Sequence, residues 1–311
     1  MKIVFFGTAD FAVPSLQRMN ESDHEVIGVV TAPDRRGGRG RKQRILSPVK
    51  NYALENELYL LQPVNLKSEE FVRQLKSLQA DIFVVVAFRM LPRMVWSMPP
   101  MGTVNLHASL LPEYRGAAPI HHAIINGETE TGLTVFKIAE EIDTGDVLCR
   151  EVVKIEPHDT TGDLHDRMAI AGSKLLLNCI EKWAVGKIDL QTQDDRLASP
   201  APKLFKEFCE LDFNQPTALV YNKIRGLSPF PTAHTTIHGQ MFKIFQARPE
   251  LFDEKLVKEP GTLITDEKSY LKIATTDGAV NCLEVQLQGK KKMNIEEFLN
   301  GMGNQLPLKA G

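Results

Sequence analysis

The sequence predicts an α/β protein of two domains, in which a parallel sheet forms the first domain and a small antiparallel β-barrel forms the second. Three observations lead to this prediction. Continuously apolar segments alternate with helix-like segments early in the chain, the composition changes at a polar stretch containing Pro200 and Pro202, and strand-like pairs joined by tight turns follow. With 311 residues, the chain also exceeds the size at which one core usually stops growing.

The first domain begins with four apolar segments of strand length. Their apolar residues run without alternation, which is typical of strands buried on both faces of a parallel sheet. The helix-like segments between them supply the crossovers, and ligands bind at the carboxyl ends of strands in such sheets. The predicted strands are residues 2–7, 26–31, 80–88 and 103–107.

Two more alternating strands and a long helix complete this domain. The strands are predicted at residues 131–138 and 146–155. After them, apolar residues recur at helical spacing, which indicates a long amphipathic helix. Cys179 continues the apolar stripe and is expected to fill the core. The stripe consists of Leu164, Met168, Ala171 and Leu175.

The prolines at 200 and 202 mark the domain boundary, because proline stiffens a polar connector into an extended form. We therefore place the first domain at residues 1–190, a linker at 191–205 and the second domain at 206–311.

The second domain begins with a short helix that ends at Gly226 and Pro229. Residues 235–247 and 270–287 each consist of a strand, a tight turn and a strand, and the Asp277-Gly278 pair is a strong hairpin signal. A small helix at 294–301 closes the chain, with Asn294 as its N-cap. These elements predict the small antiparallel β-barrel.

Composition and charge exclude several classes of protein. Apolar residues make up 43% and charged residues 24%, as in ordinary soluble domains, and the net charge is only −2, so any nucleic-acid surface has to be local. The four cysteines form no CxxC pair, which argues against a zinc site and a disulfide framework. The N-terminus lacks a signal-peptide pattern, and no apolar run approaches the roughly 20 residues that span a bilayer. We expect a cytoplasmic protein with free thiols.

One strand end carries the residues best suited to catalysis. Asn105 and His107 are two positions apart on a predicted strand, so their side chains share a face. An amide and an imidazolium together can donate hydrogen bonds to an oxygen that gains negative charge during acyl transfer. Asp143, in the turn-forming DTGD, can approach the same strand end and keep His107 charged.

No motif supplies a protein nucleophile, so direct transfer from a bound donor to a bound amine is the predicted chemistry. Each residue alone has a structural alternative, because a single histidine often packs and DTGD is also an ordinary turn. His121 and His122 lack metal-ligand spacing, and the FGTADF segment falls short of a dinucleotide-binding motif, so neither a metal nor a nucleotide cofactor is predicted.

Residues 34–44 form a dense basic segment with three glycines. Six basic residues against one acid can follow a phosphate backbone, although a solvated charged loop is the alternative. A weaker basic patch lies at 289–293. The basic residues of the first segment are Arg35, Arg36, Arg39, Arg41, Lys42 and Arg44.

Along nearly its whole length, the sequence resembles the methionyl-tRNA formyltransferase family. The motifs that carry the resemblance are FGTADFAVPSL, APDRRGGRGRKQRILSPVK, NLHASLLPEYRGAAPI, IDTGDVL, RGLSPFPTA and GKKKMNIEEFLNG. The resemblance implies a Rossmann-like formyltransferase domain followed by a small OB-fold-like domain that helps to hold tRNA. It also implies that 10-formyltetrahydrofolate is the formyl donor and that methionyl initiator tRNA, used in translation initiation, is the acceptor.

The resemblance further assigns roles to residues. Asn105, His107 and Asp143 match the family's catalytic residues, and the basic segment matches its tRNA-binding loop, with Arg39 at the position of a key arginine. Phe88 and Arg89 stand where many relatives have an Ala-Tyr-Gly, and are expected to line the pterin pocket with altered contacts. The folate-binding stretch corresponds to Ser109, Leu110, Leu111 and Pro112.

Two alternatives fit part of the sequence. A formyltransferase for a small amine, or a hydrolase that releases formate, would use the same three polar residues without needing the basic segment. A non-catalytic RNA-binding protein would need the basic segment but none of the three. We expect a monomer, because one catalytic domain and one tRNA-holding domain in the same chain suffice for the reaction.

Overall fold

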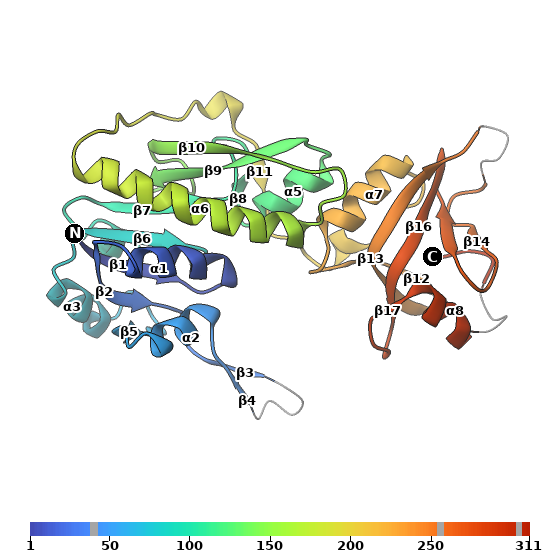
Figure 1. Cartoon of the computed structure of the whole chain (residues 1–311), viewed down its shortest axis with the longest axis horizontal. Coiled ribbons are helices and arrows are strands. Elements are labelled where there is room, and N and C mark those ends of the chain that lie inside the picture. Colours follow the sequence, from blue (N-terminus) through green and yellow to red (C-terminus); the bar gives the residue numbers. More distant parts are fainter. Residues whose placement is uncertain (38–42, 254–257, 303–306) are drawn as a thin grey trace. The chain divides into compact units, whose positions relative to one another are not determined.

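The computed structural model describes residues 1–37, 43–253, 258–302 and 307–311 (Figure 1). It divides into two compact units, each made of several chain segments. Unit 1 comprises residues 1–116, 131–153 and 165–200, and unit 2 comprises residues 117–130, 154–164 and 201–311.

In the described part of unit 1, seven strands form a mixed sheet in the order β10-β9-β7-β6-β1-β2-β5. Strands β5, β2, β1, β6 and β7 run parallel, whereas β9 runs antiparallel to β7. The four strands predicted first are confirmed, and their carboxyl ends meet at one edge of the sheet. The strands are β1 (Lys2–Gly7), β2 (Glu25–Val30), β5 (Leu60–Leu61), β6 (Ile82–Val86), β7 (Thr103–His107), β9 (Glu130–Lys137) and β10 (Val147–Lys154).

Helices pack on this sheet, and two of them begin at a serine that caps the first turn. Ser47 and Ser68 cap α2 and α3 by accepting from the backbone N–H groups of Lys50 and Phe71. The long predicted helix is α6, and Gly172 lets it approach Leu106 of β7 closely. The helices are α1 (Val13–Asn20), α2 (Pro48–Glu55), α3 (Glu69–Ser77), α4 (Arg93–Trp96) and α6 (Thr161–Ala184), with short 3-10 turns η1 (Asp10–Ala12) and η3 (Asp195–Leu197).

The two ends of the basic segment pair with each other as the strands of one short hairpin, which the sequence did not predict. Strands β3 (Arg35–Gly37) and β4 (Gln43–Ile45) pair antiparallel. At its base the Lys50 ammonium donates to Asp34 at 2.7 Å. This hydrogen bond, and a second from Gln62, hold the pKa of the Asp34 carboxyl below its usual value. The ion pair therefore fixes where the basic hairpin leaves unit 1.

The described residues of unit 2 contain a six-stranded antiparallel sheet around an apolar core that includes Phe242 and Phe298. Both predicted hairpins are confirmed, and Asn294 accepts from the backbone N–H of Glu297 at 2.8 Å, as predicted for an N-cap. The strands are β12 (Ala233–Ile237), β13 (Gln240–Leu251), β14 (Leu263–Thr265), β15 (Leu271–Ala274), β16 (Gly278–Leu287) and β17 (Met293–Asn294). The helices are α5 (Pro119–Ile125), α7 (Thr217–Gly226), α8 (Ile295–Met302) and the 3-10 turn η4 (Glu207–Cys209).

Two early segments of the chain belong to unit 2 by their contacts. Ile125 of α5 packs on the unit 2 core, and the Thr161 hydroxyl donates to the carbonyl of Gly226 at 2.7 Å. No change of composition marks residues 117–130 or 154–164 in the sequence. Along the described ranges, none of the helices is both long enough and apolar enough to span a membrane.

Candidate active site

The structure brings the three predicted catalytic residues together at the carboxyl edge of the unit 1 sheet. Asn105 and His107 lie on one face of β7, between β6 and β9. His107 is 6% exposed, whereas Asn105 is half-buried. The Asn105 carboxamide has no hydrogen-bond partner within the described ranges. It is therefore available to a ligand at this edge.

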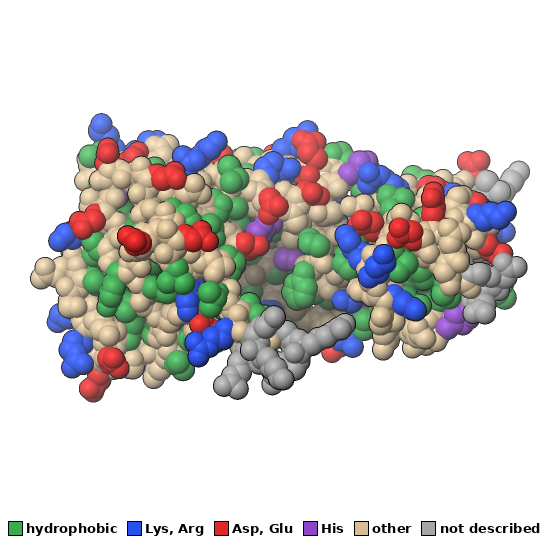
Figure 2. All heavy atoms as spheres, turned by 60° about the horizontal axis from the view of Figure 1, so that its bottom comes forward, with side chains coloured by type: hydrophobic (Ala, Val, Ile, Leu, Met, Phe, Trp, Pro, Cys, Tyr) green, Lys and Arg blue, Asp and Glu red, His purple; other side chains and the backbone are tan. Residues whose placement is uncertain are grey.

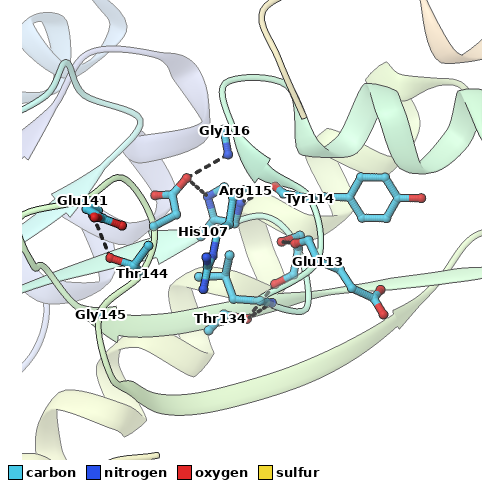
Figure 3. Close-up of polar contacts among 12 residues, drawn as sticks. His107, Glu113, Tyr114, Arg115, Gly116, Thr134, Glu141, Thr144 and Gly145 are labelled. Atoms are coloured by element: carbon cyan, nitrogen blue, oxygen red, sulfur yellow. Dashed lines mark hydrogen bonds and ion pairs between the residues drawn. The ribbon is translucent and has the colours of Figure 1, made fainter. Parts of the chain in front are cut away.

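The His107 ring is held by one backbone carbonyl. Nε2 lies 2.9 Å from the carbonyl oxygen of Tyr114 (Figure 3). A carbonyl only accepts, so Nε2 carries the hydrogen of this bond. Nδ1 faces the Asp143 carboxylate, with Oδ2 at 3.7 Å. That distance is an ion-pair contact and exceeds a hydrogen bond, so Nδ1 is the ring nitrogen left for a reacting group.

Asp143 comes from the loop between β9 and β10, and this loop is tightly folded. Asp143 has a φ of +58°, and its Oδ2 accepts from the backbone N–H of Gly116 at 2.9 Å. The Thr144 hydroxyl closes the turn by donating to the carbonyl of Glu141 (Figure 3). At Gly145 a Cβ would lie 1.6 Å from the carbonyl oxygen of Lys137, so only glycine fits there. Backbone packing thus places the carboxylate.

Gln193 and Arg115, which were not predicted as site residues, also hold this loop. The Gln193 carboxamide donates to the carbonyls of Asp143 and Gly145, and it accepts from the Arg115 guanidinium. Arg115 lies inside the motif NLHASLLPEYRGAAPI, whereas Gln193 lies in a polar segment outside every motif. Nothing in the sequence therefore distinguishes Gln193 from a solvated side chain.

The predicted folate-binding stretch follows His107 directly and is largely buried. Ser109, Leu111 and Pro112 are buried, whereas Leu110 is half-buried. Thr134 of β9 fixes the stretch, because its hydroxyl donates to the carbonyl of Ser109 at 2.6 Å and accepts from the N–H of Leu111 at 3.1 Å (Figure 3). Leu110 is therefore the residue of this stretch whose side chain remains most available to a ligand.

Phe88 and Arg89 lie after β6, at the same edge as Asn105. The half-buried Phe88 ring meets Phe6 edge-on, with centroids 5.7 Å apart. The Arg89 guanidinium donates to the carbonyls of Pro63 and Val64 and lies 5.7 Å from the Phe88 ring centroid. Phe88 and Arg89 therefore line the carboxyl edge of the sheet on the β6 side. The Arg89 guanidinium is already hydrogen-bonded to backbone carbonyls.

The basic hairpin is described only in part. Arg35 and Arg44 are exposed on β3 and β4. The side chain of Arg36, and the residues Arg39, Arg41 and Lys42, lie outside the described part. Figure 2 shows acidic, basic and apolar side chains interspersed over the face it presents, as a net charge of −2 leads one to expect.

Other polar groups of the sequence have structural contacts. His121 and His122 each meet a backbone carbonyl through Nε2, those of Phe230 at 3.1 Å and Pro202 at 2.9 Å. Within the described residues, no group of three His, Cys, Asp or Glu side chains is placed to hold a metal ion. The four cysteines, all of them described, are free thiols, and Cys149 is the only one of the four that is not buried.

Unit 2 contains a separate cavity of about 510 Å³ with none of the catalytic candidates in its lining. Its walls are mostly apolar and include Phe205 and Phe230, which are 62% and 78% exposed. Lys203, Lys206 and Lys243 also line it. Exposed aromatic rings beside lysines are suited to nucleic-acid bases and phosphates.

Comparisons with known proteins agree with this architecture. Residues 1–180 match the family described as "Formyl transferase", and residues 203–303 match "Formyl transferase, C-terminal domain". The chain is 46% identical over 314 residues to the methionyl-tRNA formyltransferase of Bacteroides fragilis, covering 97% of this chain and 95% of that protein.

Two solved structures share the fold at lower identity. HypX from Aquifex aeolicus, in complex with tetrahydrofolic acid, matches with a TM-score of 0.66 and 21% identity over 96% of this chain and 47% of that chain. The methionyl-tRNA formyltransferase from Clostridium thermocellum matches with a TM-score of 0.56 and 17% identity over 80% of this chain and 94% of that chain. At these identities the two matches show the fold alone.

Proposed function

Because the chain belongs to the methionyl-tRNA formyltransferase family, we propose that Asn105, His107 and Asp143 carry out its formyl transfer. The enzyme transfers the formyl group of 10-formyltetrahydrofolate to the α-amino group of methionyl initiator tRNA, for translation initiation. The observation that carries the assignment is the 3.7 Å approach of Asp143 Oδ2 to His107 Nδ1. Beside this pair, on the same strand face as His107, lies the Asn105 amide, which has no hydrogen-bond partner among the described residues.

The folate supplies the formyl carbon. A bond forms between that carbon and the methionyl nitrogen, and the bond to the folate nitrogen breaks. The amine gives up one proton, and the released folate nitrogen takes up one proton. Asn105 and the Nδ1–H of His107 donate hydrogen bonds to the formyl oxygen as it gains negative charge. The negative charge of Asp143 stabilises the positive charge on the His107 ring.

Asp143 also provides the acceptor for the amine proton. Its Oδ2 is engaged by the Gly116 N–H and faces His107. Its Oδ1 has no hydrogen-bond donor in the described part of the chain, so this oxygen can accept the proton directly or through a water.

The edge residues suit a flat folate ring. Phe88 offers a half-buried aromatic face, Leu110 a half-buried aliphatic one, and Asn105 an amide that no other described residue engages. Because their side chains are buried, we assign Ser109, Leu111 and Pro112 to packing beneath this surface rather than to direct contact with the folate. Arg89 supports this surface through its bonds to the carbonyls of Pro63 and Val64.

The tRNA contacts fall on the basic hairpin and on unit 2. The exposed Arg35 and Arg44 support phosphate binding by the basic segment, whose sequence also contains Arg36, Arg39, Arg41 and Lys42. In unit 2, the exposed rings of Phe205 and Phe230 beside lysines support contact with unpaired nucleotides. We place the enzyme in the cytoplasm, where charged tRNA is used, and as a monomer, because one unit of one chain supplies all three catalytic groups.

The decisive test offers the enzyme 10-formyltetrahydrofolate with methionyl initiator tRNA, methionyl elongator tRNA, amino sugars or no acceptor. We expect formylation of the initiator tRNA alone. Formylation of an amino sugar, or release of formate without acceptor at a comparable rate, would overturn the assignment.

A variant tests the catalytic residues separately. Losing one oxyanion donor typically costs about 10² to 10³ in kcat, so Asn105→Ala is expected to lose that much with little change in KM for tRNA. The matched control is Asn56→Ala, on the exposed end of α2, with unchanged kcat. Near-normal turnover by Asn105→Ala would remove Asn105 from the mechanism.

A further inference from the structure

Gln193 is a buried glutamine whose side-chain amide makes four hydrogen bonds. It lies on the segment after α6 and is 8% exposed. Its Nε2 donates to the carbonyl oxygens of Asp143 at 2.9 Å and Gly145 at 2.8 Å. Its Oε1 accepts from Arg115, with Nε at 3.2 Å and Nη2 at 2.8 Å. A carboxamide has two donor hydrogens and one acceptor oxygen with two lone pairs. Every hydrogen-bonding position of this side chain is therefore used.

The partners allow only one orientation of this amide. A half-turn about its last bond would set Oε1 against two carbonyl oxygens and the NH₂ group against a guanidinium. The backbone next to it is fixed as well, because Gln191 and Val147 exchange two backbone hydrogen bonds of 2.8 and 3.0 Å. The segment thus presents the amide to the Asp143 loop in a set position.

Gln193 joins the two segments that set the geometry between His107 and Asp143. On one side it holds the backbone of Asp143 itself. On the other it binds Arg115, whose neighbours in the chain are Tyr114, the acceptor for His107 Nε2, and Gly116, the donor to Asp143 Oδ2. The Arg115 guanidinium is held in turn by Asp195 at 2.7 Å. Movement of Gln193 would therefore act on both residues of the His107–Asp143 pair.

The Asp143 loop needs such a restraint. A φ of +58° at a residue other than glycine is a left-handed conformation that residues with a Cβ rarely adopt. Conformations of this kind persist where surrounding contacts determine them. The two hydrogen bonds from Gln193 fall on residue 143 and on residue 145, on either side of the turn.

We propose that Gln193 is a positioning residue for formyl transfer, which keeps the Asp143 carboxylate at its distance from His107 by hydrogen-bonding the loop backbone. The proposal rests on the catalytic role assigned to Asp143 above. Gln193 touches no reacting atom, so its effect is on turnover and passes through Asp143.

The first test is Gln193→Met, which keeps the length of the side chain and removes all four hydrogen bonds. A displacement of about 1 Å in a catalytic group costs up to about 10²-fold, so we expect kcat to fall about 10- to 100-fold. KM for methionyl-tRNA should stay within about twofold. The matched control is Gln191→Met, two residues away on the same segment but exposed, with kcat unchanged. Equal kcat values for the two variants would overturn the proposal.

A second variant separates the donors from the acceptor. Gln193→Glu keeps an acceptor for Arg115 and loses both N–H donors to the loop, so it should lose kcat as Gln193→Met does even if the methionine variant folds poorly. Wild-type turnover by the glutamate variant, with thermal unfolding unchanged, would show that the donors do not position Asp143.

A double-mutant cycle with Asp143→Asn shows whether the effect passes through Asp143. In the Asp143→Asn background, Gln193→Met should lower kcat by less than about threefold, because coupled residues are not additive. Losses that multiply would show that Gln193 acts independently and would end the positioning role. If Asp143→Asn alone keeps its turnover, the proposed catalytic role of Asp143 fails instead. If Asp143→Asn lowers kcat but Gln193→Met does not, the catalytic role of Asp143 stands and only the positioning role of Gln193 fails.

Discussion

Substituting Gly145 with alanine tests whether backbone packing places Asp143. A Cβ on Gly145 would lie 1.6 Å from the carbonyl oxygen of Lys137 and 2.9 Å from its carbonyl carbon. Such contacts essentially never fall below 3.0 Å, so one of the two backbones has to move by at least 1.4 Å. Gly145 is two residues from Asp143, and the Gln193 side chain hydrogen-bonds the carbonyls of both residues, so the movement reaches the Asp143 carboxylate.

The expected loss follows from that displacement. A catalytic group misplaced by 1 Å can lose about 10²-fold, so kcat of Gly145→Ala should fall by at least about that factor in steady-state formylation. Overpacking of this kind costs about 1–3 kcal/mol of folding free energy, which should lower Tm by several degrees. KM for methionyl-tRNA should change little, because the described tRNA candidates lie elsewhere in the chain.

Gly301→Ala is the matched control. Gly301 lies in α8, and a Cβ there would meet none of the described atoms within 4 Å. Alanine is favoured over glycine inside a helix by roughly 0.5–1 kcal/mol, so Tm should hold or rise and kcat should not change. A Gly145→Ala enzyme whose kcat stays within about threefold of the wild type would refute the reasoning, because the loop would then tolerate the shift without moving Asp143.

Three further predictions concern other parts of the molecule. If Arg44 contacts a tRNA phosphate, Arg44→Ala should reduce the slope of log affinity against log salt by about 1, and an unchanged slope in a binding titration would make Arg44 a solvated residue. Burial lowers the pKa of His234 below its ordinary value of about 6.5. The folded state therefore binds this proton less readily than the unfolded chain does, and stability falls as pH drops below 6.5. The Tm of His234→Gln should fall less than that of the wild type between pH 7.5 and 5.5, and an equal fall would contradict this. A hydrogen bond with the Cys179 thiol lowers the pKa of Cys149, whereas burial raises the pKa of Cys282. Limited iodoacetamide should therefore label Cys149 before Cys282, as measured by mass spectrometry at neutral pH, and equal labelling of the two would disprove the difference.

The elements that the sequence predicted well are those with a local signal. The strand at 2–7 has an unbroken apolar run and is buried from Ile3 onward. The Asp277-Gly278 turn and the Asn294 cap each depend on residues a few positions apart. Asn105 and His107 share a face because strand periodicity is two, which holds wherever the strand lies. Local rules were therefore enough to place these residues.

The contacts that the sequence did not reveal join residues far apart in the chain. Gln193 lies 50 residues from Asp143 and 78 from Arg115. Cys149 and Cys179 have no motif spacing, yet their thiols meet between β10 and α6. A glutamine in a polar segment looks the same whether it is solvated or clamps a loop, since only the tertiary fold decides its burial. The ring nitrogen of His107 that faces Asp143 likewise depends on the carbonyl of Tyr114.

The neutral Gln193 amide, which links Arg115 to the Asp143 loop, has an electrostatic consequence for the site. A guanidinium set directly against Asp143 would pair with the carboxylate and weaken its attraction for His107. Instead, the Arg115 guanidinium is bound to the Gln193 oxygen and to Asp195, and the amide passes only N–H hydrogen bonds to backbone carbonyls of the Asp143 loop. The loop is thereby tied to Arg115 without a cation on the carboxylate itself. In the mechanism proposed above, the Asp143 charge then remains directed at His107, and the positive form of His107 is the better donor to the formyl oxygen as it becomes negative.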